Sequence, residues 1–165
     1  MRLLGYGHTT DHLPLDRKDV PNFPVARKSA ARAYEMAGLT PRDVDAADVH
    51  DCFTISEIVA SEIIGFAEPG AGVPLLESGA TMLPSVRAEL GIAPPARSVP
   101  INPGGGLIGD GHPVGATGVR QVVEAFQHLT QRAGPRQVDG ARRYLTFNMG
   151  GSVTTSVTMI WGNES

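Results

Sequence analysis

The sequence NPGGGLIGDGHPVGATG, from Asn102 to Gly118, carries most of the information about the fold and the site. It places seven glycines around a single histidine, His112, which Pro113 follows directly. Proline is favoured in the first turn of a helix, where its missing N–H costs nothing. We therefore expect a long helix to begin at Pro113, with His112 beside free backbone N–H groups and the positive end of the helix dipole. Such a site suits a carbonyl that becomes an oxyanion.

The helix predicted after this loop runs from Pro113 to Ala133, because Gly134 and Pro135 then stop it. Its spacing gathers apolar side chains on one face, namely Val119, Val122, Val123 and Phe126. A face of this kind is too apolar to be left in water, so we expect the helix to be heavily buried. A homodimer or larger assembly is one way to bury it.

The rest of the chain predicts alternating strands and helices in one domain, residues 1–165. Strands are expected at 2–7, 47–50, 99–102, 143–149 and 153–161, and helices at 23–37 and from Thr54 onward, the latter with a capping box to Glu57. The segment 66–98 is irregular, with a short helix near 85–90. This βαβαβαββ order predicts an α/β fold, a mixed five-stranded sheet with helices on its faces.

Composition excludes several classes of function. The 165 residues carry a net charge of -3 and no basic cluster, which disfavours nucleic acid and acidic membranes as partners. The apolar runs are far shorter than a membrane span, and the first residues lack the apolar core of a signal peptide. A single cysteine, Cys52, permits no internal disulfide, so we expect a reducing, cytoplasmic location.

Three short motifs are candidates for chemistry, and each has an ordinary structural alternative. In HDCF, residues 50–53, a cysteine near a helix start is either a reactive thiol or an inert buried side chain. In GHP, residues 111–113, the histidine is either catalytic or a surface residue. In NMGGS, residues 148–152, the glycines form either a plain hairpin or a set of backbone donors for a ligand.

Two further patterns have weaker support. The glycines from Gly104 to Gly109 match the dinucleotide fingerprint GxGxxG, but the predicted helix starts too late for it, and no Gly-Lys-Ser/Thr follows for a phosphate loop. The trio His8, Asp11 and His12 could suggest a metal site, but a solvated loop is favoured there. We therefore predict no metal.

Taken together, HDCF, NPGGGLIGDGHPVGATG and NMGGS make the chain similar to the C-terminal half of a thiolase, in particular of the sterol-carrier-protein type. The resemblance covers essentially the whole chain and implies one βαβαβαββ half of a two-half enzyme. The nucleophilic cysteine of that family lies in the other half, and no residue here matches it. The segment 66–98 is longer than expected at its place.

The resemblance also implies roles for individual residues. His112 would activate the missing cysteine and hold the thioester oxygen, His50 would complete that oxyanion site, and Cys52 would move the α-proton. Asn148 stands where many thiolases carry a second catalytic cysteine, a task that Cys52 would take over. Gly150 would be a backbone donor to the second oxyanion hole. The substrate would contact four more residues, Gly105, Gly106, Phe53 and Met149.

The sequence thus predicts a thiolase-type acyltransferase domain for acyl-CoA thioesters, with coenzyme A as a substrate and no further cofactor. It would be inactive alone, and its partner would be an N-terminal thiolase half or further copies of itself. Two alternatives remain open, a thiolase-like retro-aldolase of β-hydroxy acyl-CoA side chains and a non-catalytic assembly subunit.

Overall fold

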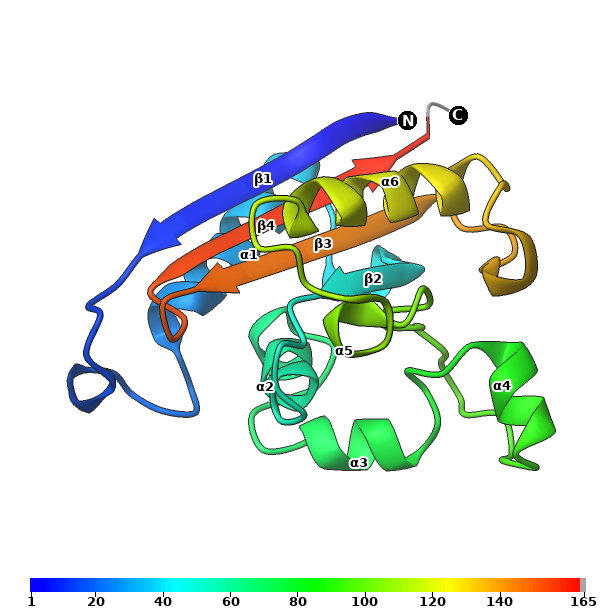
Figure 1. Ribbon diagram of the computed structural model, residues 1–165, viewed down its shortest axis with the longest axis horizontal. Helices are drawn as coiled ribbons and strands as arrows, with labels where there is room; N and C mark the ends of the chain where they lie inside the picture. Colours follow the sequence, from blue (N-terminus) through cyan, green and yellow to red (C-terminus); the bar gives the residue numbers. More distant parts are fainter. Residues whose placement is uncertain (164–165) are drawn as a thin grey trace.

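A mixed β-sheet forms the centre of the computed structural model, which describes residues 1–163 (Figure 1). The strands are β1 (Arg2–Thr10), β2 (Ala46–Val49), β3 (Arg143–Gly150) and β4 (Thr155–Gly162), in the order β1-β4-β3-β2. Strands β2 and β3 are parallel, and β4 is antiparallel to both of its neighbours. The predicted α/β class is confirmed.

The prediction of a fifth strand at 99–102 is wrong. Only Ile101 forms a bridge there, parallel to Ala47. Two prolines, Pro100 and Pro103, flank it. Because proline has no N–H to donate, this segment cannot extend a ladder along β2. It still holds the chain beside the sheet, since the N–H of Asn102 donates to the carbonyl of Ala47 at 2.8 Å.

The helices agree with the sequence in their order but not in all their ends. They are α1 (Pro24–Ala37), α2 (Ser56–Ile63), α3 (Gly72–Glu77), α4 (Pro84–Glu89), α5 (Gly106–Asp110) and α6 (Thr117–Leu129). The helix expected from Pro113 begins at Thr117, because the carbonyl of Pro113 closes a turn by accepting from the N–H groups of Ala116 and Thr117. The prediction of α6 extending to Ala133 was therefore too long at both ends. Helix α5 was not predicted at all.

The capping box predicted at Thr54 is also absent. Helix α2 starts at Ser56, and no side chain caps its first turn. The Glu57 carboxylate instead accepts a bond from the Asn102 amide, at 3.4 Å. The Glu57 side chain, which the local pattern predicted to cap the helix, therefore binds Asn102, a residue distant in the sequence.

One face of the sheet is covered by α1 and carries the main core. Gly5 and Gly7 let β1 approach the helix closely, because a Cβ at Gly7 would lie 2.0 Å from the carbonyl oxygen of Ser29. The Ser29 and Thr158 hydroxyls bond across the contact at 2.9 Å. Small and medium apolar side chains fill the rest of this core, among them Ala26, Ala30, Ala33, Val49, Leu145, Phe147 and Ile160.

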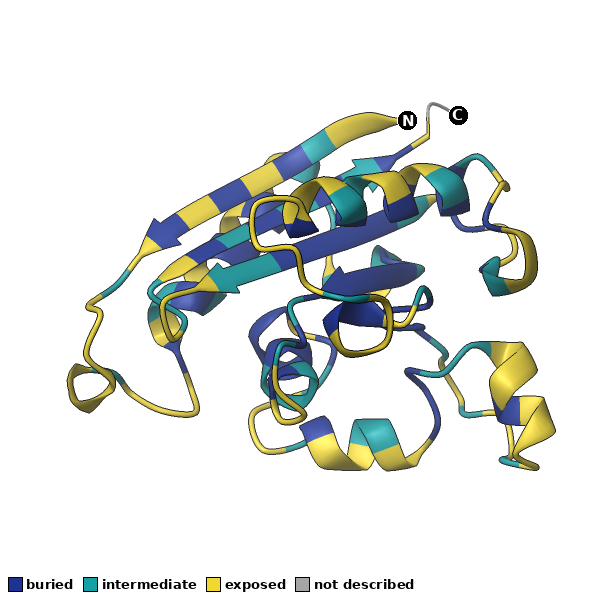
Figure 2. Cartoon of the chain, viewed as in Figure 1, coloured by how far each residue is buried: buried dark blue, intermediate teal, exposed yellow. Residues whose placement is uncertain are grey.

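The opposite face is covered by α6, and here the side chains that point inward are largely polar. Gln121, Glu124 and His128 are buried, and the His128 ring stacks on Tyr144 with centroids 5.4 Å apart. The apolar stripe that we expected to be buried faces outward instead, as Figure 2 shows for the exposed side of α6. In this chain Val119 is 67% exposed and Phe126 is 40% exposed.

The segment 66–98 is better ordered than its composition suggests. It contains α3 and the short helix predicted near 85–90, which is α4. The buried Arg87 holds the segment together by donating to the carbonyl of Gly79 at 3.0 Å. No helix within residues 1–163 has both the length and the apolar character that crossing a bilayer requires.

Candidate active site

A half-open cavity of about 700 Å³ lies on the α6 side of the sheet, where β2 and β3 end. The carboxyl ends of parallel strands are where α/β folds place their ligands. His50 enters it directly after β2, His112 comes from the glycine loop, and Gly150 ends β3. The other residues that line it are Val114, Gly115, Thr117, Gly118, Val119, Val122, Thr146, Asn148, Met149, Gly151, Val157 and Met159.

The two imidazoles face each other at the edge of this cavity. The rings of His50 and His112 meet edge to face, with centroids 4.8 Å apart and planes at 90°. They come from loops 62 positions apart in the chain, so the fold brings together two motifs that the sequence singled out separately. Paired imidazoles are suited to moving protons near neutral pH.

Thr117 sets the orientation of His112. Its buried hydroxyl lies 2.7 Å from His112 Nδ1 and donates its own proton to the carbonyl of Pro113 at 3.3 Å. With the hydroxyl proton directed to that carbonyl, the hydroxyl oxygen accepts from Nδ1–H, and Nε2 of the exposed His112 ring has a free lone pair. An imidazole with a free Nε2 lone pair at the edge of a cavity has the chemistry that a general base needs.

His50 is held by a chain of amides. Its Nδ1 lies 3.3 Å from Oδ1 of Asn148, and the Nδ2 of Asn148 donates to Oε1 of the buried Gln121. Burial lowers the pKa of His50, and the Asn148 hydrogen bond opposes this only in part. His50 is therefore held neutral at pH 7.

Cys52 does not line this cavity. It is a free, half-buried thiol in the turn that leads to α2. Its neighbour Asp51 ties that turn to the glycine loop, since Asp51 Oδ1 accepts from the N–H of Leu107 at 2.6 Å. A Cβ at Gly106 would lie 2.3 Å from the Asp51 carboxylate, so only glycine fits there. No role was predicted for Asp51, because the N–H that its carboxylate accepts from lies 56 positions away in the chain.

The four predicted substrate contacts are dispersed. Met149 lines the cavity with the two histidines, whereas Phe53 is 71% exposed to solvent. Gly106 packs on the Asp51 carboxylate, and Gly105 borders a separate hollow of about 280 Å³. That hollow also contains Glu57, a carboxyl whose pKa burial raises to about 7.

The hairpin after Gly150 has unusual backbone geometry. Gly151, Ser152 and Val153 all have positive φ, at 57°, 56° and 64°. This conformation is rare for a β-branched residue such as Val153. The side-chain nitrogen of Lys18 stabilises the turn by donating to the carbonyl of Ser152 at 2.6 Å. The predicted tight turn is therefore present, and a loop from the other end of the chain supports it.

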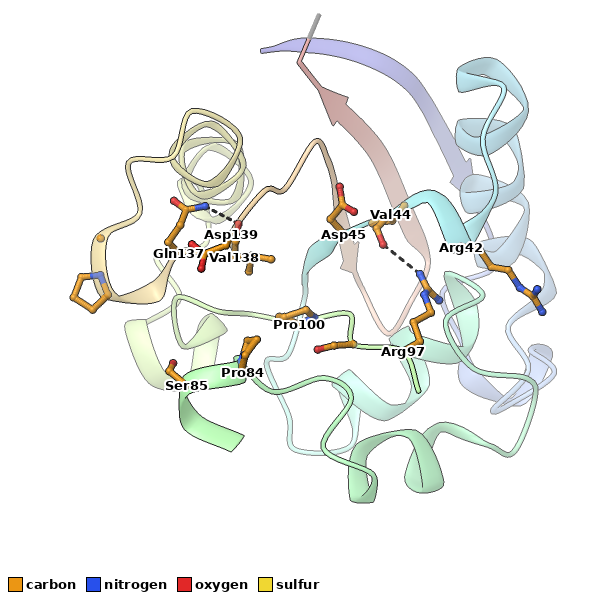
Figure 3. Close-up of a pocket in the computed structure, with 13 residues that line it drawn as sticks. Arg42, Val44, Asp45, Pro84, Ser85, Arg97, Pro100, Gln137, Val138 and Asp139 are labelled. Carbon is orange, nitrogen blue, oxygen red and sulfur yellow. Dashed lines mark hydrogen bonds between the residues drawn. The ribbon is translucent and has the colours of Figure 1, made fainter. Parts of the chain in front are cut away.

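Another hollow, of about 520 Å³, lies at the opposite end of β2 (Figure 3). None of the predicted site residues lines it. Arg97 lines this hollow, but its guanidinium is engaged within the chain. It donates to the carbonyls of Pro41 at 2.7 Å and Val44 at 3.2 Å. Within residues 1–163, no group of three or more His, Cys, Asp or Glu side chains is arranged to hold a metal ion.

A family model described as thiolase C-terminal domain-like matches residues 7–163. Since the match spans nearly the whole chain, the protein belongs to this family, and the resemblance drawn from HDCF, GHPVGATG and NMGGS is confirmed. An acetyl-CoA acetyltransferase of Methanothermobacter thermautotrophicus is 40% identical over 88% of this chain. Sterol carrier protein 2 of Bos taurus is 39% identical over 83% of it. The aligned regions are only 35% and 23% of those two relatives.

Solved structures show the same fold. The Ltp2-ChsH2(DUF35) aldolase matches with a TM-score of 0.75 and 19% identity, over 94% of this chain and 38% of its own. A monomeric SCP2-thiolase like protein type 1 from Mycobacterium smegmatis matches with a TM-score of 0.65 and 19% identity, over 99% of this chain and 29% of its own. The chain thus has the fold of one part of larger proteins.

Proposed function

We propose that this chain is the C-terminal half of a thiolase-type acyltransferase for acyl-CoA thioesters, active in Claisen condensation or in its reverse, thiolysis. The observation that carries the proposal is the edge-to-face pair of His50 and His112 in a half-open cavity. The residues that line this cavity within the described chain include no cysteine. A site with bases but no nucleophile fits half of an enzyme.

In the cleavage direction, the nucleophile is a cysteine thiol of an N-terminal half. His112 Nε2 takes its proton, and the thiolate attacks the 3-keto carbon of the substrate. The bond between C2 and C3 then breaks, the acyl group stays on the nucleophile, and C2 takes a proton from Cys52. Free coenzyme A then gives its thiol proton to the Cys52 thiolate and attacks the acyl group, and the departing cysteine thiolate takes back its proton from His112. Condensation runs through the same steps in reverse.

Two oxyanions form along this route, and both need fixed donors. We assign the thioester oxygen to His112 and His50, and the second oxyanion to the backbone of Gly150. The glycines around these residues support the assignment, because they let a thioester approach the backbone closely. The acid/base role of Cys52 rests on the resemblance to thiolases, because the thiol follows His50 and Asp51 in the chain but lies outside the lining of the cavity.

The outward face of α6 is where we place the N-terminal half. Val119, Val123 and Phe126 are 67%, 47% and 40% exposed. Apolar surface of this extent on a soluble chain indicates a protein interface. The partial coverage of the relatives supports the need for a further half, because the aligned regions are only 35% and 23% of their length.

Coenzyme A is a substrate in this proposal, and no further cofactor takes part. The single cysteine is consistent with a cytoplasmic location, since the chain has no second thiol with which to form an internal disulfide.

The test is an assay of acyl-CoA cleavage by free coenzyme A. We expect no turnover from the chain alone, and turnover when a cysteine-bearing N-terminal thiolase half is added. In the pair, His112→Ala should lower kcat by about 10²–10⁴-fold, the usual contribution of a general base. Val73→Ala, on the exposed side of α3 and away from the cavity, is the matched control and should leave kcat unchanged.

Three results would overturn this function. Turnover by the chain alone, at the rate of the pair, would make Cys52 the nucleophile. Cleavage of a β-hydroxy acyl-CoA without any nucleophilic cysteine in the pair would indicate a retro-aldolase instead. A pair that forms but cleaves neither substrate would indicate an assembly subunit.

A further inference from the structure

Gln121 is a buried amide behind the site, and its burial is unusual. It lies on the inner side of α6 and is 0% exposed. Its Oε1 accepts from the Nδ2 of Asn148, whereas its own Nε2 has no hydrogen-bond partner among the described residues. A buried donor without a partner costs stability. An apolar side chain of similar volume would serve the core better, so packing alone does not account for a glutamine here.

The bond from Gln121 fixes which way the Asn148 amide points. With Nδ2 turned toward Gln121, Oδ1 is turned toward His50 Nδ1, 3.3 Å away. An amide oxygen can only accept, so His50 must carry its proton on Nδ1. The lone pair of the neutral ring then lies on Nε2, on the opposite side of the imidazole.

We propose that Gln121 is a positioning residue, which acts through Asn148 to hold His50 in its Nδ1–H tautomer with Nε2 as an acceptor. The tautomer follows from the placement of the Asn148 and Gln121 amide oxygens and nitrogens, whereas its consequence for catalysis rests on the proposed function.

The consequence is that the two histidines act differently on the oxyanion. Thr117 also leaves His112 with a bare Nε2, but His112 gains a proton there when it deprotonates the thiol, and it can then donate directly to the oxyanion. His50 keeps a bare Nε2, because burial disfavours its charged form. It can therefore reach an oxyanion only through a water, which donates one proton to Nε2 and the other to the substrate oxygen.

The test is the tautomer of His50, read from long-range proton–nitrogen correlation spectra of the chain labelled with ¹⁵N-histidine. The five histidines are distinguished by assigning His50 through His50→Asn. We expect the wild-type signal to be that of an Nδ1–H tautomer. In Gln121→Met, whose side chain has similar volume and no strong acceptor, the Nε2–H population should rise roughly fivefold to tenfold, the loss of about one hydrogen bond.

Two variants separate positioning from packing. Gln121→Glu keeps an oxygen for Asn148, so it should retain the wild-type tautomer. Gln127→Met, on the same helix, removes a bond from Arg136 at 3.0 Å and has no link to His50, so it should change nothing at His50. If Gln121→Met does not fold, the wild-type tautomer and the Gln121→Glu spectrum still decide the matter.

An Nε2–H tautomer in the wild type would overturn the proposal, and so would an unchanged tautomer in folded Gln121→Met. A second readout uses the pair with an N-terminal half, where Gln121→Met should lower kcat and leave KM nearly unchanged. If the pair has no thiolase activity at all, the proposed function fails, while the tautomer measurement still tests the role of Gln121.

Discussion

The two faces of the sheet differ in which side chains are buried and which are exposed. On the α1 side, small apolar residues such as Ala26, Ala30 and Ala33 meet the strands, and the outer side of α1 is mostly polar. On the α6 side, buried polar groups such as Gln121 and His128 meet the strands, and valines face the solvent. The first face stabilises this chain by itself. The second forms the cavity and leaves apolar side chains exposed, the surface on which we place the N-terminal half.

The largest effect is expected on the α1 side, from Gly7→Ala. The new Cβ would lie 2.0 Å from the backbone oxygen of Ser29, so helix and strand must separate. Overpacking of this kind costs about 3 kcal/mol in the free energy of unfolding. Urea unfolding measures it. Gly109→Ala is the control, because nothing lies within 4 Å of its Cβ position, and its unfolding midpoint should be close to that of the wild type. Equal stability of the two variants would show that the contact between Gly7 and Ser29 leaves room for a methyl group.

On the α6 side, we expect the reverse pattern from Val119→Gln combined with Phe126→Gln. The two side chains are 67% and 40% exposed, so the free energy of unfolding should change only slightly, by about 0.5 kcal/mol. Binding to an N-terminal thiolase half should weaken at least about tenfold, which corresponds to roughly 1.4 kcal/mol. Calorimetric titration measures both affinity and stoichiometry. Met36→Gln, on the outer side of α1 and 57% exposed, is the matched control for an interface limited to the α6 side.

A smaller effect concerns the buried carboxyl of Asp48, beneath α6. Burial raises its pKa to about 7, while Arg120 opposes this, and the Tyr144 hydroxyl donates to it at 3.1 Å. Between pH 4 and 7 the folded chain holds a proton that the unfolded chain has lost, so the stability due to Asp48 falls as pH rises through 7.

Asp48→Asn should therefore gain stability relative to the wild type by about 1 kcal/mol between pH 6 and pH 8. Thermal or urea unfolding at the two pH values gives the difference. Asp139→Asn, on a surface turn, should show no such gain. A difference between wild type and Asp48→Asn that is the same at both pH values would mean that Asp48 titrates well below pH 6.

The structure on the α1 side of the sheet could be predicted from the sequence, because short local patterns determine where α1 begins and ends. Pro24 and Gly38 mark the ends of α1 in the chain, and the structure agrees. The glycine-rich loop similarly located His112. The start of α6 was misplaced because Pro113 occupies a turn before the helix, where proline is equally acceptable.

The α6 side of the sheet was harder to predict, because its structure depends on contacts between distant parts of the chain. The apolar stripe with Val119 and Phe126 was identified, but periodicity cannot tell whether a stripe faces its own core or a partner. The role of Gln121 leaves no local pattern, since it depends on Asn148, 27 positions away. Asp51 was likewise missed because its partner, Leu107, comes from a different loop.

The central proposal is that this chain supplies the bases of a thiolase site and an N-terminal thiolase half supplies the nucleophile. Intact-mass spectrometry after mixing the chain, an N-terminal half and an acyl-CoA tests it most directly. We predict that the N-terminal half gains the mass of one acyl group and that this chain keeps its unmodified mass. An acyl group found on Cys52, with the N-terminal half unmodified, would contradict the account.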